Sequence, residues 1–126
     1  MTQTLQRLAE LDDLDAAFVR ASTRPILIFK HSPTCGTSAQ AYEEIELLLE
    51  DPAWLTDIYV VFVQASRVVS NEIATRLNLR HESPQVLLVQ NGVVRWHASH
   101  FRVTAEAIRA GLSRSLSAPT AVVALR

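Results

Sequence analysis

Short apolar runs alternate with longer amphipathic segments along this chain of 126 residues. The runs at 25–30, 58–63 and 86–89 are rich in β-branched residues and lack polar alternation, which is typical of strands buried on both faces. The dipeptide Asn91-Gly92 then predicts a hairpin that joins the third run to the strand after it. The first eleven residues are ambiguous, because their spaced leucines fit either a helix or a short edge strand.

Apolar residues recur at intervals of three and four in the segments between these runs, which predicts amphipathic helices. Aspartates at the beginning of the first segment suit a helix N-terminus, and Ser70 is expected to cap the third helix. The proline after Asp51 ends the second helix. The predicted helices cover residues 12–21, 36–49, 71–79 and 104–116.

The elements follow the order helix, strand, helix, strand, helix, then a hairpin and a final helix, with no internal repeat or linker. A βαβ unit followed by a β-hairpin and a helix is the thioredoxin-like arrangement. We therefore expect an α/β fold with a central mixed sheet of about four strands, flanked by helices on both faces. Residues 1–116 are expected to form this single domain. The tail 117–126 is expected to be frayed or to pack on a neighbouring molecule.

The composition narrows the class of partner. The chain is 48% hydrophobic and 20% charged, and its net charge of −1 without long charged runs argues against a nucleic-acid or membrane surface as the main partner. No apolar run approaches the ~20 residues of a membrane span, and the first residues lack the pattern of a signal peptide. One cysteine cannot form an internal disulfide. A reducing cytoplasm is therefore the expected compartment.

The single cysteine, Cys35, lies where the first predicted strand turns into a helix. The first amides of a helix lack intrahelical acceptors, and the helix dipole adds positive potential there, so a thiolate at this place is stabilised. The thiolate is the nucleophilic form of cysteine. Small polar neighbours on both sides would leave the sulfur reachable. The alternative is a buried core thiol, which is how free cysteines most often behave.

A second loop is expected to face this cysteine. In a thioredoxin-like arrangement, the segment before the hairpin lies beside the strand-to-helix turn, and here it carries Ser83-Pro84. An X-Pro bond is the only kind that becomes cis at low cost, so a cis peptide is expected. Its use would be to present the main-chain N–H and C=O of Ser83 to an extended thiol ligand. The alternative is a trans proline that begins an edge strand.

Four stretches of the chain together resemble the YtxJ-type monothiol bacilliredoxins. They are Phe29-Lys30-His31-Ser32, Thr34-Cys35 with Ser38, 80–88 (Arg-His-Glu-Ser-Pro-Gln-Val-Leu-Leu) and Ala98-Ser99-His100. The resemblance extends from about Leu11 to Leu116. It implies a thioredoxin-like fold and a role in removing bacillithiol, a small bacterial thiol, from proteins that carry it as a mixed disulfide.

The resemblance also implies a set of roles for the site. Cys35 would be the nucleophile and bacillithiol the co-substrate, with no tightly bound cofactor, and thiolated client proteins would be the partners of a monomer or weak dimer. Ser38 occupies the position where dithiol oxidoreductases carry a resolving cysteine, and its expected role is hydrogen bonding within the first helical turn. The residues expected to line the site are Lys30, His31, Thr34, Gly36, Thr37, Ser38, Ser83, Pro84 and His100.

One departure from the family bears on these roles. Members often have Thr-Cys-Pro-Ile-Ser, whereas this chain has Thr34-Cys35-Gly36-Thr37-Ser38. The glycine loosens the first turn of the helix. The loop also resembles the Cys-Gly-x-Ser of monothiol glutaredoxins, so a protein that uses glutathione or an iron–sulfur cluster is an alternative. The stretch after the hairpin, however, lacks the glycine pair of such proteins.

Other readings of the same residues stay open. A thioredoxin-like adaptor whose cysteine only becomes thiolated would show the same fold, since fold alone does not fix function. One of the four histidines could pair with Cys35 in a hydrolase-like dyad. No closely spaced ligand pair such as His-x3-His or Cys-x2-Cys is present, so no metal site is expected.

Overall fold

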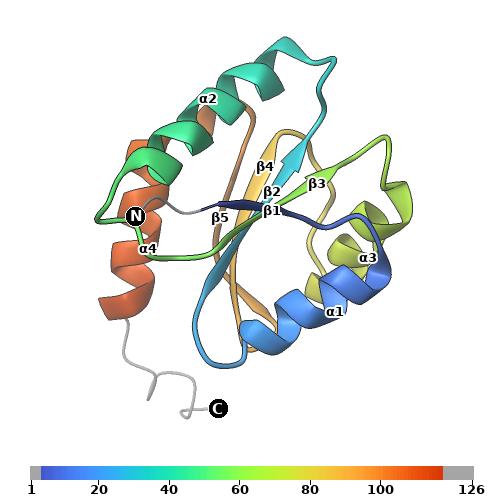
Figure 1. Cartoon of the computed structure of the whole chain (residues 1–126), viewed down its shortest axis with the longest axis horizontal. Helices are drawn as coiled ribbons and strands as arrows, with labels where there is room; N and C mark the ends of the chain where they lie inside the picture. The colour runs from blue at the N-terminus through green and yellow to red at the C-terminus, as the bar shows by residue number, and fades with distance from the viewer. Residues whose placement is uncertain (1–3, 118–126) are drawn as a thin grey trace.

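The computed structural model describes residues 4–117, and Figure 1 shows a sheet between two layers of helices. The predicted alternation of strands and helices is confirmed. The elements are β1 (Leu5–Arg7), α1 (Leu11–Arg20), β2 (Ile26–His31), α2 (Gly36–Glu50), β3 (Ile58–Phe62), α3 (Arg67–Leu77), β4 (Gln85–Gln90), β5 (Val93–Ser99), the 3-10 turn η1 (His100–Arg102) and α4 (Ala105–Ser117).

The sheet has five strands in the order β1-β3-β2-β4-β5. Strands β1, β3 and β2 are parallel, and β4 and β5 are antiparallel to their neighbours. The mixed sheet was therefore predicted correctly, but its count of about four strands was one short. The additional strand is β1, an edge strand that Leu8 extends by donating its N–H to the carbonyl of Val60 at 2.8 Å.

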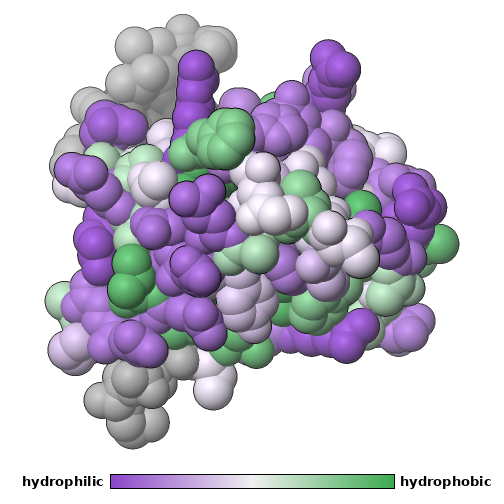
Figure 2. Space-filling view, turned by 90° about the horizontal axis from the view of Figure 1, so that it is seen from above, coloured by the Kyte–Doolittle hydropathy of each residue, from purple (hydrophilic) through white to green (hydrophobic). Residues whose placement is uncertain are grey.

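Both faces of the sheet are covered, which explains the unbroken apolar runs. In β2, Leu27 and Phe29 belong to the core on the α2 and α4 side, whereas Ile26 and Ile28 belong to the core on the α1 and α3 side. Alternate side chains of a strand point to opposite faces, so a strand between two helical layers must be apolar throughout. The face seen in Figure 2 is mainly hydrophilic, with hydrophobic residues in scattered groups.

Helix α3 begins earlier than the sequence pattern predicted. Its N-cap is Ser66, and the helix runs over Arg67–Leu77 instead of 71–79. Ser70 is therefore a fully buried residue of the first turns, not the cap. The helix ends at Asn78, whose φ of 50° places it in the left-handed region that asparagine tolerates.

The last elements follow the prediction closely. Asn91 and Gly92 have φ values of 54° and 74°, as a two-residue hairpin turn between β4 and β5 requires. The hydroxyl of Thr104 accepts the N–H of Ala107 at 3.1 Å and so caps α4. Of the apolar face expected for this helix, Leu116 is 66% exposed and does not join the core.

The predicted tail 117–126 lies outside the described residues, except for Ser117 at the end of α4, so its fate stays a prediction. None of the helices in the described part combines the length and apolar character needed to cross a bilayer.

Candidate functional site

Cys35 lies immediately before α2 and is its N-cap residue. Its extended backbone, with φ −103° and ψ 126°, lets its carbonyl accept the N–H of Ala39 at 3.0 Å while its own N–H reaches the carbonyl of Ser32 at 3.0 Å. The side chain is partly exposed. The sulfur therefore belongs to the loop and the first turn of the helix, and the alternative of a buried core thiol does not hold.

Ser38 connects the first turn of α2 to the residues before Cys35. Its hydroxyl is fully buried, accepts the N–H of Ser32 at 2.9 Å and lies 2.8 Å from Nδ1 of His31. The expected hydrogen bond within the first turn is thus replaced by bonds that reach back to the end of β2. Since a hydroxyl cannot form a disulfide, this position holds the loop in place and offers no second sulfur.

His31 is a buried support of the loop. Its ring packs against Phe29, Tyr42 and Phe62, with ring centroids 5.3, 4.9 and 5.7 Å away. Burial lowers its pKa, because the charged imidazolium is poorly solvated there. The side chain is only 7% exposed, so the prediction that His31 lines an open groove was wrong.

Lys30 lies on the opposite face of the sheet from His31. It is fully buried, and its ammonium donates to Nδ1 of His81 at 3.0 Å, with the Ser70 hydroxyl 3.4 Å from the same nitrogen. Burial lowers the pKa of Lys30 to about 8. Burial, followed by the charges of Lys30 and Arg67, also lowers the pKa of His81. The prediction that Lys30 lines the groove was therefore wrong, because its side chain is fully buried and bonded to His81.

The Ser83-Pro84 loop lies against the cysteine loop. Its peptide bond is cis, and the hydroxyls of Ser83 and Ser32 are 2.7 Å apart. The Pro84 carbonyl accepts the N–H of His100 at 2.9 Å. Within residues 4–117 no hydrogen bond occupies the main-chain N–H or C=O of Ser83. Ser32, which was not among the expected site residues, joins the two loops.

His100 lies at the rim of the same region, at the start of η1. Its φ of 58° is left-handed, and its ring is more than half exposed, with Nε2 3.9 Å from Oε1 of Glu82. A hydrogen bond with Ser99 lowers the pKa of Glu82, and the positive field of His100 and Arg80 adds to the effect. His100 and Thr37 line one small hollow of about 90 Å³, so the structure brings these two expected residues together.

The remaining expected residues lie in and after the cysteine loop. Thr34 and Gly36 are exposed and Thr37 is partly exposed. A Cβ added at Gly36 would meet nothing within 4 Å, and this residue has no left-handed φ. Its glycine is therefore required neither by packing nor by backbone geometry, and it leaves open space next to the cysteine.

A second hollow borders the cysteine loop on the side of the sheet edge. It has a volume of about 480 Å³ and is lined by Arg7, Pro33, Thr34, Phe62, Gln64 and Ala65. This hollow was not predicted from the sequence, because the segment that contains Arg7 has no clear pattern of apolar residues. Within residues 4–117 no group of three or more His, Cys, Asp or Glu side chains is arranged to hold a metal ion.

Comparison with solved structures shows the thioredoxin fold. A protein assigned as an oxidoreductase with a thioredoxin fold is 28% identical, with a TM-score of 0.75 over 85% of this chain and 92% of its own. The thioredoxin of Fasciola hepatica is 15% identical, with a TM-score of 0.71 over 88% and 99% of the two chains. The Malassezia sympodialis thioredoxin Mala s 13 is 14% identical, with a TM-score of 0.72 over 90% and 91%.

The family comparison is more specific. The family described as "Monothiol bacilliredoxin BrxC" matches residues 6–108, which include both loops of the site and His100. This match agrees with the single cysteine and with the serine three residues after it. The fold and the family together indicate a thiol–disulfide redox protein. The chain belongs to the monothiol bacilliredoxin family.

Proposed function

We propose that this protein removes bacillithiol from mixed disulfides on bacillithiolated proteins, with Cys35 as the nucleophile. One observation carries the proposal: a partly exposed sulfur at the N-terminus of α2, with a fully buried serine where a resolving cysteine would stand. The thiolate is the form of cysteine that attacks disulfides, and a partly exposed sulfur can reach a disulfide presented by another molecule.

The reaction has two exchange steps. The Cys35 thiolate attacks the bacillithiol sulfur of a protein–S–S–bacillithiol disulfide, forms a Cys35–bacillithiol disulfide and releases the client protein as its thiolate. A second bacillithiol thiolate then attacks the bacillithiol sulfur bound to Cys35, which releases the Cys35 thiolate and bacillithiol disulfide. The sum converts one mixed disulfide and one thiol into one protein thiol and one small disulfide, and it needs no bound cofactor.

The Ser83-Pro84 loop supplies the place where the disulfide would lie. The free main-chain N–H and C=O of Ser83 can pair with the extended backbone of a ligand, as the edge of a sheet does. Such pairing would hold the attacked disulfide in line with Cys35, and in-line geometry is required for thiol–disulfide exchange. Side chains of the ligand would contribute little to this pairing, because it uses main-chain groups alone.

The test follows the fate of the small thiol by intact mass. A bacillithiolated client protein and its glutathionylated counterpart are each incubated with the wild-type chain and with Cys35→Ser. The wild type is expected to gain one bacillithiol and to pass it on when free bacillithiol is added, whereas Cys35→Ser is expected to show no transfer. Transfer by Cys35→Ser at the wild-type rate would contradict the proposal.

A second candidate is favoured by the Cys35-Gly36-Thr37-Ser38 loop, which resembles that of monothiol glutaredoxins. It would show preferential uptake of glutathione in the same experiment, or visible absorbance in protein purified without oxygen. A third outcome, uptake of one equivalent without turnover, would identify a thiol-accepting adaptor. The same two substrates thus separate all three functions.

A further inference from the structure

The hollow beside the cysteine loop has features of a ligand site. Its volume of about 480 Å³ lies within the range of small-molecule pockets. Pro33, Phe62 and Ala65 give it apolar walls, while Thr34, Gln64 and Arg7 contribute polar groups. A small number of polar groups in an apolar hollow is the usual composition of a site that orients a ligand.

Arg7 is held above this hollow by an aromatic ring. Its guanidinium carbon lies 4.5 Å from the centroid of Phe62, which fixes the planar group by a cation–π contact. Among residues 4–117 the arginines that form ion pairs are Arg20, Arg76 and Arg109, so Arg7 has no carboxylate partner there. An oriented arginine with free N–H donors is suited to bind a carboxylate.

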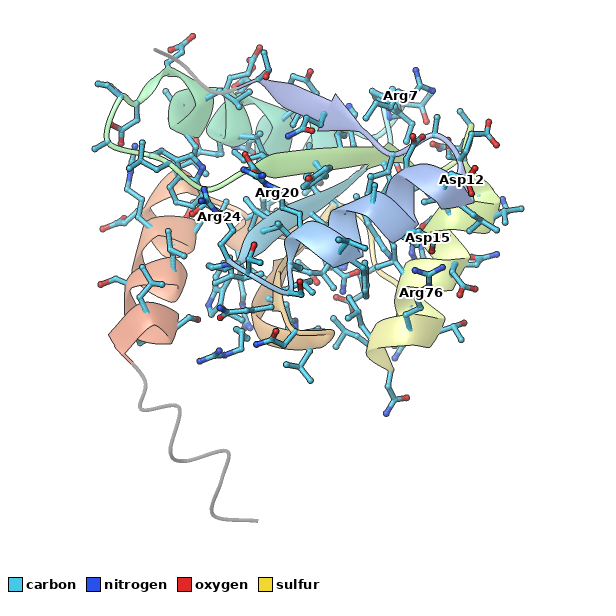
Figure 3. The ribbon with its side chains drawn as sticks, turned by 60° about the horizontal axis from the view of Figure 1, so that its bottom comes forward. Arg7, Asp12, Asp15, Arg20, Arg24 and Arg76 are labelled. Atoms are coloured by element: carbon cyan, nitrogen blue, oxygen red, sulfur yellow. The ribbon has the colours of Figure 1, made fainter. Side chains whose placement is uncertain are left out.

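The position of the hollow links it to Cys35. Thr34 lines it, and the Cα atoms of adjacent residues are only about 3.8 Å apart. Strands β1, β2 and β3 are parallel, so Arg7 at the end of β1, the cysteine loop after β2 and the loop after β3 lie at the same end of the sheet. Figure 3 places Arg7 at this end, away from Arg20 and Arg24. Ligands bind outside the carboxyl ends of parallel strands in many α/β proteins.

The hollow on the other side of the cysteine loop is a poorer alternative. It lies between Thr37 and His100, and its volume of about 90 Å³ leaves room for only a few atoms. Glu44 also lines it, and a carboxylate there would repel an anionic ligand. A small thiol that carries negative charge is therefore better matched, in both size and charge, by the hollow that Arg7 lines.

We propose that Arg7 is a specificity residue that binds a carboxylate of the small thiol while that thiol is disulfide-bonded to Cys35. The assignment rests on the function proposed above. It adds that the site selects small thiols that carry a carboxylate, such as bacillithiol. Phe62 holds the guanidinium in place, and Gln64 offers an amide to the same ligand. The hollow then discriminates between anionic and neutral thiols that share the same reacting sulfur.

The test measures how fast Cys35 forms a mixed disulfide with two symmetrical disulfides, one of bacillithiol and one of neutral 2-mercaptoethanol. In each case the Cys35 thiolate gains one thiol group and releases the other as a thiolate. The quantity compared is the ratio of the two rate constants, because a general change in Cys35 reactivity cancels in it. For Arg7→Gln this ratio is expected to fall about tenfold at low ionic strength.

Control variants separate charge from structure. Arg7→Lys keeps the positive charge but loses the planar guanidinium that stacks on Phe62, so it is expected to retain only part of the ratio. Arg24→Gln, an exposed arginine at the opposite end of the sheet, is expected to leave it unchanged. Added salt should reduce the difference between the wild type and Arg7→Gln, because ions screen an exposed charge.

The outcomes distinguish this proposal from the function on which it rests. A wild-type chain that forms no bacillithiol adduct at all would overturn the proposed function. A wild-type chain that forms the adduct, together with an Arg7→Gln variant whose ratio is unchanged, would overturn only the assignment of Arg7. A folded Arg7→Gln variant is identified by an unfolding transition like that of the wild type.

Discussion

The two loops of the site rest on consecutive residues of one strand, but by different chemistry. His31 supports the cysteine loop through Ser38 on the α2 face of the sheet. Lys30 supports the Ser83-Pro84 loop through His81 on the α3 face. Both side chains are buried at the end of β2, where the pleat of the strand sends them in opposite directions. A single strand end therefore positions both halves of the site.

The difference between the two supports lies in charge. The Ser38 hydroxyl, the Ser32 N–H and the imidazole of His31 form a small network without a formal charge, in which the buried polar groups have partners. Lys30 brings an ammonium into the protein interior and meets an imidazole instead of a carboxylate. Satisfied neutral networks stabilise a core, whereas buried charges without a counter-ion destabilise it. We therefore expect opposite signs when the two supports are removed.

Breaking the neutral support is expected to have the largest effect on stability. In Ser38→Ala the N–H of Ser32 and Nδ1 of His31 both lose their buried partner, which should lower the free energy of unfolding by about 2 kcal/mol. Urea unfolding measures the change. Gln40→Ala, an exposed substitution in the same helix, is the matched control. A loss no larger than that of the control would show that the network contributes nothing.

Removing the charged support is expected to act in the opposite direction. Lys30→Met keeps the volume and removes the buried charge, so it should raise the free energy of unfolding at pH 7 by about 1–2 kcal/mol. The pKa of Lys30 is about 8 in the folded protein against 10.5 for a free lysine. Between these values the unfolded chain binds more protons, so wild-type stability rises with pH and the advantage of the variant shrinks. An advantage that stays constant from pH 7 to 10.5 would refute this account.

Of the three interactions, the contact between the two loops is expected to contribute least to the free energy of unfolding. Ser83→Ala removes the hydroxyl that meets Ser32 Oγ in a partly buried setting, so the free energy of unfolding should fall by about 0.5–1 kcal/mol. Thermal unfolding is the measurement, with Ser22→Ala in the exposed turn after α1 as the reference. A loss as large as that of Ser38→Ala would mean that the two loops are more strongly coupled than their supports suggest.

The sequence predicted the position of the site better than its interior. Cys35 at a strand-to-helix turn and Ser83-Pro84 before a hairpin could be located because each is tied to a pattern of neighbouring elements. Lys30 and His31 could not be placed, since a polar residue at the end of an apolar run gives no sign of which face it occupies or how deeply it is buried. Their burial depends on His81 and Ser38, which are distant in the chain.

Two further differences arise from weak local signals. Strand β1 is only three residues long, and so short a segment has no measurable periodicity. The start of α3 contains two adjacent valines, whose β-branched side chains have low helix propensity and obscured the beginning of the helix at Arg67. Arg7 of β1 lines the hollow beside the cysteine loop together with Gln64 and Ala65 of the loop before α3, so the weak signals for where these elements begin and end also concealed this hollow.

Each polar group of Ser32 forms a hydrogen bond with a different residue. Its carbonyl receives the Cys35 N–H, its own N–H reaches Ser38, and its hydroxyl meets Ser83. No other side chain of similar size offers a hydroxyl in that place without adding a methyl group. Redesign of this protein for another thiol should therefore keep Ser32 unchanged. The positions to vary are Thr34, Gly36 and the other residues that line the hollow beside the cysteine loop.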